Sequence, residues 1–218
     1  GMVPPSEFIE LAEVSGAITP LTKWVITTAL AELSRWHESG HELRMSCNLS
    51  VRNLHDRGLV SWIAAQLQLS GITPDYLKLE ITESELMQDP THALEVLGRL
   101  RALGTETSID DFGTGYSSLA YLKSLPIDEL KIDKSFVDHM ATDAHDLAIV
   151  RSTIDLSHDL GLTVTAEGVE DLATLRRLAE LGCDRAQGYY VSRPVPASQL
   201  AAWLDDAPQR DDLVIVLP

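Results

Sequence analysis

The chain has 218 residues, which is enough for one large domain with a buried core. Its formal net charge of -16 disfavours DNA, RNA polymers and anionic lipid, which attract clustered lysine and arginine. The sequence has no apolar run of membrane-spanning length, and its two cysteines, Cys47 and Cys183, lack the spacing of a metal or redox pair. We therefore expect one cytoplasmic domain that inserts into no membrane and keeps two free, buried thiols.

Hydrophobic periodicity alternates between helical and strand-like segments, which predicts an α/β fold of parallel strands joined by helices. Helices are expected at 5–14, from 21 to the Ser39-Gly40 stop, at 59–69, 92–103, near 119, around 147–154, at 172–179 and at 197–204. Strands are expected at 43–48, 77–82, 106–110, 129–132, 162–166 and 185–189. The apolar stripe predicted for the second helix consists of Leu21, Trp24, Val25, Ala29, Leu33 and Trp36.

Polar side chains stand where the apolar strand-like runs end, namely Asn48, Glu80, Asp110 with Asp111, Lys131, Glu167 and Gln187. In parallel α/β barrels the carboxyl ends of the strands face one mouth, so these side chains are expected to converge there. Alternation along 79–83 also points Glu80 away from the surface that Leu79 and Ile81 bury. The pattern predicts a functional site at this mouth.

Asp110 and Asp111 are adjacent carboxylates, followed by a loop that contains Gly113 and Gly115. Two neighbouring carboxylates repel each other unless a cation or a shared proton relieves them. The other acidic strand ends disfavour the alternative that Asp110 caps a turn and Asp111 is merely solvated. Oxygen ligands without histidine or thiolate clusters favour Mg²⁺ or Mn²⁺ over Zn²⁺, with Ca²⁺ as a competitor.

These parts predict a hydrolytic mechanism. Two cations bridged by Asp110 would activate a water and clamp a phosphodiester, while Glu167 positions or deprotonates that water. Lys131 is either a structural counter-ion or a group that orients the water and stabilises phosphoryl charge. Glu83 and Glu170 fit supporting roles, and Gln187 and Tyr189 either contact the substrate or are structural.

Six ordered motifs carry a resemblance to the bacterial EAL domain family from about Val3 to Pro194, namely Asn48-Leu49-Ser50, Glu80-Ile81-Thr82-Glu83-Ser84, DDFGTGYSSLAYLKSLP from Asp110, Lys131-Ile132-Asp133, AEGVE from Ala166 and QGYYVSRP from Gln187. The resemblance implies a modified (β/α)8 TIM-like barrel that commonly dimerises. It also implies hydrolysis of the second messenger cyclic di-GMP to linear pGpG with Mg²⁺ or Mn²⁺, and inhibition by Ca²⁺. Residues 195–218 would form a C-terminal helix and an apolar tail of a single domain, 1–218.

The resemblance also implies a role for each matching residue. Asn48, Glu80 and Asp110 would bind one metal, and Asp110, Asp111 and Glu167 the second. Lys131 would hold the attacking water and form the catalytic set with Glu167 and Glu170. Asp133 and Gln187 would bind substrate, and the loop after the two aspartates would be supported by Glu83, Gly113 and Gly115.

The chain departs from the family at its beginning. The Glu-Ala-Leu motif, which provides a further ligand glutamate and a substrate-binding arginine, is expected upstream of Val3 and is absent, as is the strand before it. We therefore expect a barrel truncated by about two N-terminal strands, with Leu213 to Leu217 or a second copy covering part of the open edge. The alternatives to an enzyme of impaired activity are a non-catalytic cyclic di-GMP receptor or protein-interaction module, and a metal-dependent barrel hydrolase or lyase for another phosphorylated substrate.

Overall fold

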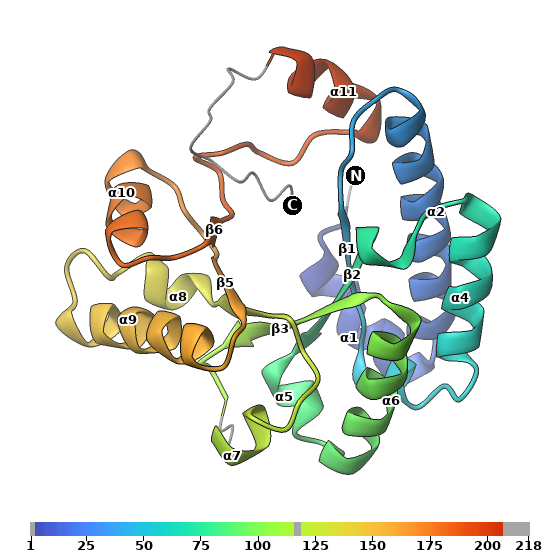
Figure 1. The fold of residues 1–218 in the computed structure, drawn as a ribbon, viewed down its shortest axis with the longest axis horizontal. Coiled ribbons are helices and arrows are strands. Elements are labelled where there is room, and N and C mark those ends of the chain that lie inside the picture. Colours follow the sequence, from blue (N-terminus) through green and yellow to red (C-terminus); the bar gives the residue numbers. More distant parts are fainter. Residues whose placement is uncertain (1–2, 116–118, 207–218) are drawn as a thin grey trace. The chain divides into compact units, whose positions relative to one another are not determined.

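The computed structural model describes residues 3–115 and 119–206 (Figure 1). The chain divides into two compact units, residues 1–107 and 108–218. Each unit combines parallel strands with helices, and a single domain over 1–218 stays a prediction. The segment Leu213–Leu217, expected to pair with a strand edge, lies outside the described residues. None of the described helices is long and apolar enough to cross a lipid bilayer.

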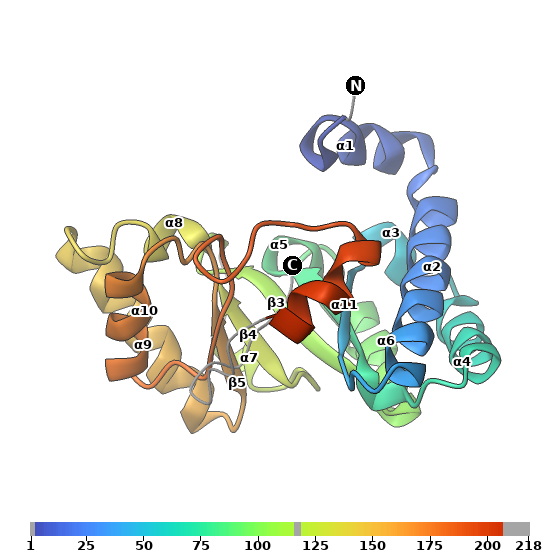
Figure 2. The ribbon, with the colours of Figure 1, turned by 90° about the horizontal axis from the view of Figure 1, so that it is seen from above.

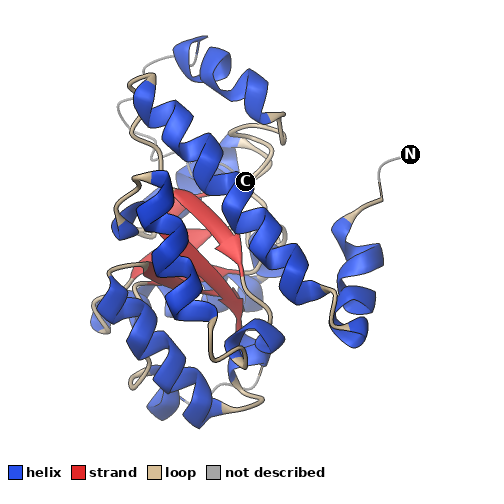
Figure 3. Ribbon diagram, turned by 90° about the vertical axis from the view of Figure 1, so that its right-hand side faces the viewer, coloured by secondary structure: helices blue, strands red, loops and turns tan. Residues whose placement is uncertain are grey.

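The first unit contains two parallel strands, β1 (Met45–Asn48) and β2 (Leu77–Thr82), with Asn48 opposite Glu80. Its helices are α1 (Pro5–Ser15), α2 (Ile18–Glu38), α3 (Val51–Leu54), α4 (Leu59–Ser70), α5 (Glu83–Leu86) and α6 (Pro90–Leu103), with a 3-10 turn η1 (Pro74–Tyr76) before β2. Figures 1 and 3 show α2, α4 and α6 on one side of the two strands. This side carries much of the buried apolar surface of the unit.

The predicted apolar stripe of α2 is confirmed only in part: Leu33 is buried, Leu21, Ala29 and Trp36 are half-buried, and Trp24 and Val25 are exposed. The helix buries Ile18, Thr22, Ile26, Leu30 and Leu33. Trp24 is 65% exposed, and the hydroxyl of the buried Thr22 donates a hydrogen bond to Asn53 Oδ1 at 3.0 Å. The helix has apolar residues on more than one face, so periodicity alone did not identify the face that packs against β1 and α4.

The second unit contains most of a parallel ladder in the order β3 (Glu106–Phe112), β4 (Glu129–Ile132), β5 (Thr163–Ala166) and β6 (Arg185–Ala186), and β3 begins in the first unit. Its helices are α7 (Leu119–Leu122), α8 (Lys134–Val137), α9 (Ala144–Asp159), α10 (Leu172–Glu180) and α11 (Ala197–Asp206). Figure 2 shows α8, α9 and α10 on one side of β4 and β5. The core between them includes Ile132, Val150, Ile154, Val164 and Val169.

The six predicted strands are all present, and two have the predicted bounds, 77–82 and 129–132. The last strand is shorter than predicted, because β6 ends at Ala186 and the chain turns at Gly188, whose carbonyl accepts from the Val191 amide at 3.0 Å. The sequence reading also missed the four-residue helices α3, α5 and α8, which follow strand ends. Such short helices show too little periodicity to be recognised.

Candidate metal centre and adjoining pocket

Asp110 and Asp111 occupy an irregular point at the end of β3. The register between β3 and β4 shifts between Ile109 and Phe112, and Asp111 has a φ of 53°, in the left-handed region. The Asp111 amide donates a hydrogen bond to Asp110 Oδ1 at 3.1 Å. Successive side chains of a regular strand point to opposite faces, so this irregularity lets both carboxylates join one cluster.

Glu167 completes a cluster of three carboxylates with Asp110 and Asp111. One carboxylate oxygen of each residue lies within 4.8 Å of the others. Glu167 follows β5, and its amide donates to the Ile132 carbonyl at 3.1 Å, which fixes the backbone beside β4. Oxygen donors at such separations fit a hard divalent cation, so these three residues would hold Mg²⁺ or Mn²⁺.

Lys131 of β4 reaches the same cluster. Its Nζ lies 3.1 Å from Asp110 Oδ1 and 2.5 Å from Glu167 Oε1, and its side chain is only 4% exposed. A buried ammonium needs such partners because the loss of hydration is costly. These contacts make Lys131 a counter-ion of the two carboxylates, and its role beside reacting atoms stays a prediction.

The electrostatics of the cluster favour an added positive charge. Burial, the charge of Asp110, and the charge and hydrogen bond of Asp133 raise the pKa of Asp111 to about 6, against the opposing effect of Lys131. Burial is the largest of these effects, and the neighbouring carboxylates Asp110 and Asp133 add to it. A divalent cation would relieve the repulsion among these carboxylates in place of the proton.

Asp133, the predicted substrate ligand, caps the N-terminus of α8. Its Oδ1 accepts from the Ser135 amide at 3.0 Å and from the Ser135 hydroxyl. Burial opposes ionisation of Asp133, but these hydrogen bonds and the one with Asp111 outweigh it and lower the pKa of this carboxyl. Asp133 therefore links the metal-binding cluster to α8, and its contact with substrate stays a prediction.

Gly113 and Gly168 of unit 2 each combine a positive φ with a close neighbour. Gly113 has a φ of +101°, and a Cβ there would lie 2.9 Å from Phe136 Cε2. Gly168, directly after Glu167, has a φ of +72°, and its Cβ would lie 2.5 Å from the Cβ of Lys134. Gly115, the other predicted loop glycine, is partly exposed at the end of a described range.

The remaining predicted metal ligands, Asn48 and Glu80, lie in the first unit. They are register partners of β1 and β2, and the Leu49 amide donates to the Glu80 carbonyl at 2.8 Å. Asn48 is exposed, whereas Glu80 is 6% exposed. Glu83, predicted to support the loop after Asp111, is buried at the start of α5 with 2% exposure. Asn48 and Glu80 thus occupy paired positions at the ends of adjacent strands, and their role as metal ligands stays a prediction.

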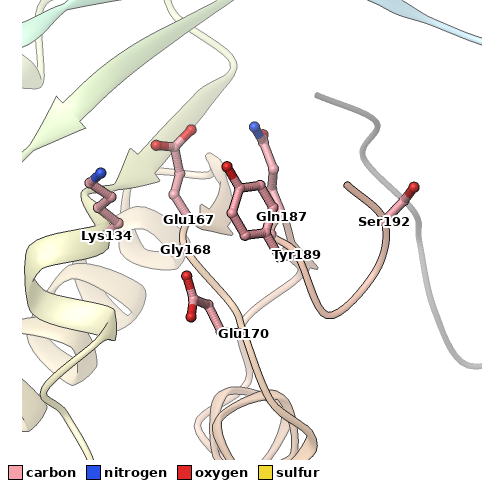
Figure 4. Close-up of a pocket in the computed structure, with 8 residues that line it drawn as sticks. Lys134, Glu167, Gly168, Glu170, Gln187, Tyr189 and Ser192 are labelled. Carbon is pink, nitrogen blue, oxygen red and sulfur yellow. The ribbon is translucent and has the colours of Figure 1, made fainter. Parts of the chain in front are cut away.

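A pocket of about 220 Å³ adjoins the carboxylate cluster within unit 2 and shares Glu167 with it. Its lining consists of Lys134, Glu167, Gly168, Glu170, Gln187, Gly188, Tyr189 and Ser192 (Figure 4). Predicted residues Glu170 and Gln187 thus meet Glu167 at one pocket. Sequence reasoning missed Lys134 and Ser192, although the position of Lys134 directly after the Lys131-Ile132-Asp133 motif was a usable signal.

The fold and this site define an α/β protein with parallel strands and a cluster of carboxylates, suited to a divalent cation, at strand ends. The chain belongs to the EAL domain family, because the model of the EAL domain matches residues 1–194. The family prediction made from the six motifs is thereby confirmed.

Several curated proteins are similar to this chain. The signaling protein YkoW of Bacillus subtilis is 42% identical over 95% of this chain and 26% of its own length. The bifunctional diguanylate cyclase/cyclic di-GMP phosphodiesterase MucR of Pseudomonas aeruginosa is 42% identical over 93% of this chain and 30% of its own length. The cyclic di-GMP phosphodiesterase NbdA of the same organism is 42% identical over 94% of this chain and 26% of its own length. The chain therefore spans roughly a quarter to a third of these relatives.

Solved structures show the same fold. The PaMucR phosphodiesterase in complex with c-di-GMP has a TM-score of 0.89 and 42% identity, covering 92% of this chain and 81% of that chain. The EAL enzyme Bd1971 bound to cAMP and cyclic di-GMP has a TM-score of 0.88 and 34% identity, covering 94% of this chain and 56% of that chain. These similarities confirm the predicted α/β fold of the TIM-like barrel type.

Proposed function

We propose that this chain is a metal-dependent phosphodiesterase domain that hydrolyses cyclic di-GMP to linear pGpG in bacterial second-messenger signalling. Two similar proteins carry cyclic di-GMP phosphodiesterase in their names, and a solved relative at 42% identity holds c-di-GMP. The observation that carries the proposal is the carboxylate cluster Asp110, Asp111 and Glu167 in contact with Lys131.

Each residue of this cluster has a proposed role. Asp110, Asp111 and Glu167 hold divalent cations, which when bound would acidify water and neutralise phosphodiester oxygens. Lys131 orients the attacking water and offsets negative charge on the phosphate, because its Nζ already lies beside Asp110 and Glu167. Glu167 accepts a proton from that water or orients it.

The other residues take their proposed roles from the family resemblance together with their own positions. Asn48 and Glu80, paired at the ends of β1 and β2, act as further metal ligands. Glu170 and Gln187 line the pocket beside Glu167, so Glu170 supports catalysis and Gln187 binds substrate. Asp133 contributes a substrate contact, and loop support is assigned to Glu83, Gly113 and Gly115.

The proposal extends to cofactor, assembly and location. Mg²⁺ or Mn²⁺ in a two-metal site is the proposed cofactor, with Ca²⁺ as an inhibitor, because all ligands are oxygens. We propose a homodimer on the family resemblance, which light scattering on the purified chain would test. The two free thiols, Cys47 and Cys183, support a cytoplasmic location.

The decisive experiment incubates the purified chain with cyclic di-GMP and Mn²⁺ and separates the products by chromatography. The Asp110→Asn variant loses a ligand, and Asp155→Asn is a matched control because Asp155 is exposed on α9. Wild type and Asp155→Asn should form pGpG, whereas Asp110→Asn should be slower by at least about a hundredfold. EDTA should stop the reaction of the wild type.

Other outcomes identify the alternatives. A non-catalytic cyclic di-GMP receptor or protein-interaction module is the second candidate, because a solved relative at 42% identity holds c-di-GMP. Tight binding of cyclic di-GMP without product would select that receptor and contradict the enzymatic proposal. A chain that neither binds nor hydrolyses cyclic di-GMP but hydrolyses another phosphate ester would contradict both the phosphodiesterase and the receptor.

A further inference from the structure

Lys134 enters the pocket from the wall formed by α8. It is the first residue of that helix and follows Asp133, which caps it. The φ of Gly168 and the absence of a Cβ allow the backbone there to pack against the stem of Lys134. Lys134 and Glu167 both line this pocket, as Figure 4 shows. The Cβ of Lys134 thus lies against the Gly168 backbone, while the residue as a whole is exposed and lines the pocket.

The pocket is otherwise negative or neutral. Among its eight lining residues Lys134 is the one cation, and Glu167 and Glu170 supply two carboxylates. The whole chain carries a formal charge of -16. An anionic group that entered this pocket would be repelled by both carboxylates unless the ammonium of Lys134 offset them.

We propose that Lys134 is a binding residue for the phosphate of the ligand that does not react. This inference rests on the proposed function, because a cyclic dinucleotide carries two phosphodiesters and only one is hydrolysed. The reacting phosphodiester lies at the carboxylate cluster, and the pocket adjoins that cluster through Glu167. The second phosphate then lies within reach of Lys134, which binds it as a point charge through a charge-assisted hydrogen bond.

The test compares Lys134→Gln with wild type in steady-state hydrolysis of cyclic di-GMP with Mn²⁺. The variant loses a hydrogen bond to a charged group that forms in both the ground state and the transition state. Its KM should therefore be about tenfold higher than that of the wild type, and its kcat should stay within about twofold. Lys134→Arg keeps the positive charge and should recover most of the affinity. Arg151→Gln removes one positive charge from the exposed surface of α9, outside the pocket lining, and should behave as wild type.

A binding measurement separates this inference from the proposed function. Titration calorimetry of cyclic di-GMP in Ca²⁺ should show about tenfold weaker binding by Lys134→Gln than by Arg151→Gln, with a smaller dependence on salt. Equal affinities of these two variants, with an active wild type, would overturn the role of Lys134 alone. A wild type that neither binds nor hydrolyses cyclic di-GMP would overturn the proposed function, and this inference with it.

Discussion

Asp110 and Asp111 are consecutive residues of one strand, yet both place a carboxylate oxygen within 4.8 Å of Glu167. The left-handed backbone of Asp111 and the register shift against β4 make this possible. A left-handed conformation costs an L-residue about 1 kcal/mol or more, and aspartate tolerates it better than most residues. The local backbone irregularity therefore coincides with the metal-binding cluster.

Divalent cations should stabilise the folded chain through this cluster. At a concentration about a hundredfold above the dissociation constant, binding contributes about 2.7 kcal/mol, which corresponds to a Tm increase of about 5 to 10 °C. Asp111→Asn removes one ligand and one repelling charge, so the variant should keep its Tm without metal and lose most of the increase. Differential scanning fluorimetry with Mg²⁺, Mn²⁺ and EDTA measures both effects. An equal Tm increase in wild type and variant would mean that the cations bind elsewhere.

Arg185 and Glu129 form an ion pair, and losing one partner should cost more stability than losing both. Arg185 Nη1 and Thr165 Oγ1 both lie 2.7 Å from Glu129 Oε1, and the Glu129 side chain is 3% exposed. Removing the cation from a buried carboxylate costs about 3 kcal/mol or more, so Arg185→Met should unfold at lower urea concentration. The double variant with Glu129→Gln should recover much of that loss. Additive losses in the double variant would contradict a coupled pair.

Gly168→Ala should destabilise the second unit by about 1 to 3 kcal/mol, because the new methyl group meets Lys134 and the φ of +72° disfavours alanine. The displaced backbone also carries Glu167, so turnover should fall. Gly98→Ala is the matched control, since Gly98 lies within α6 with no heavy atom within 4 Å of its added Cβ. It should stabilise the chain by about 0.5 to 1 kcal/mol. Urea denaturation measures the unfolding free energies of both variants. Equal changes in Gly168→Ala and Gly98→Ala would refute the steric explanation.

Thiol ionisation should couple to folding at alkaline pH. Burial, followed by the charge of Glu80, raises the pKa of Cys47 to about 12, and burial raises the pKa of Cys183 to about 11. The protonated thiols favour the folded state fully below the unfolded pKa of about 8.5, and this contribution is lost as pH rises through 11 to 12. Unfolding free energies between pH 8 and 11 should therefore fall more steeply for wild type than for Cys47→Ala.

Labelling with a thiol reagent at pH 8 provides a second readout of the same prediction. Native protein should react slowly at Cys47, which is buried, and at Cys183, which is half-buried, because thiols with raised pKa values form little thiolate. Denaturant should restore the rate of free cysteine. Rapid labelling of Cys47 in the native protein would contradict its 4% exposure as well as its raised pKa.

The strand positions were predictable because apolar runs of four to six residues between turn signals are a local property. The segments 77–82 and 129–132 have the predicted bounds for that reason. The buried face of α2 was not predictable, since Trp24 and Ile26 are both apolar and only contacts with β1 and α4 select between them. Local periodicity reports how apolar a segment is, and packing decides which side of it is covered.

For the site, the sequence by itself determined which chemical groups stand at the strand ends, because the ends of the apolar runs are visible locally. Those carboxylates, amide and lysine are the basis on which a site for a hard cation is predicted. Only the tertiary structure decided that Asp110, Asp111 and Glu167 meet and that Lys131 contacts two of them. It also added Lys134 and Ser192 to a pocket with Glu170 and Gln187. These residues are far apart along the chain, and their distances depend on strand register and on the left-handed turn at Asp111, which no local pattern specifies.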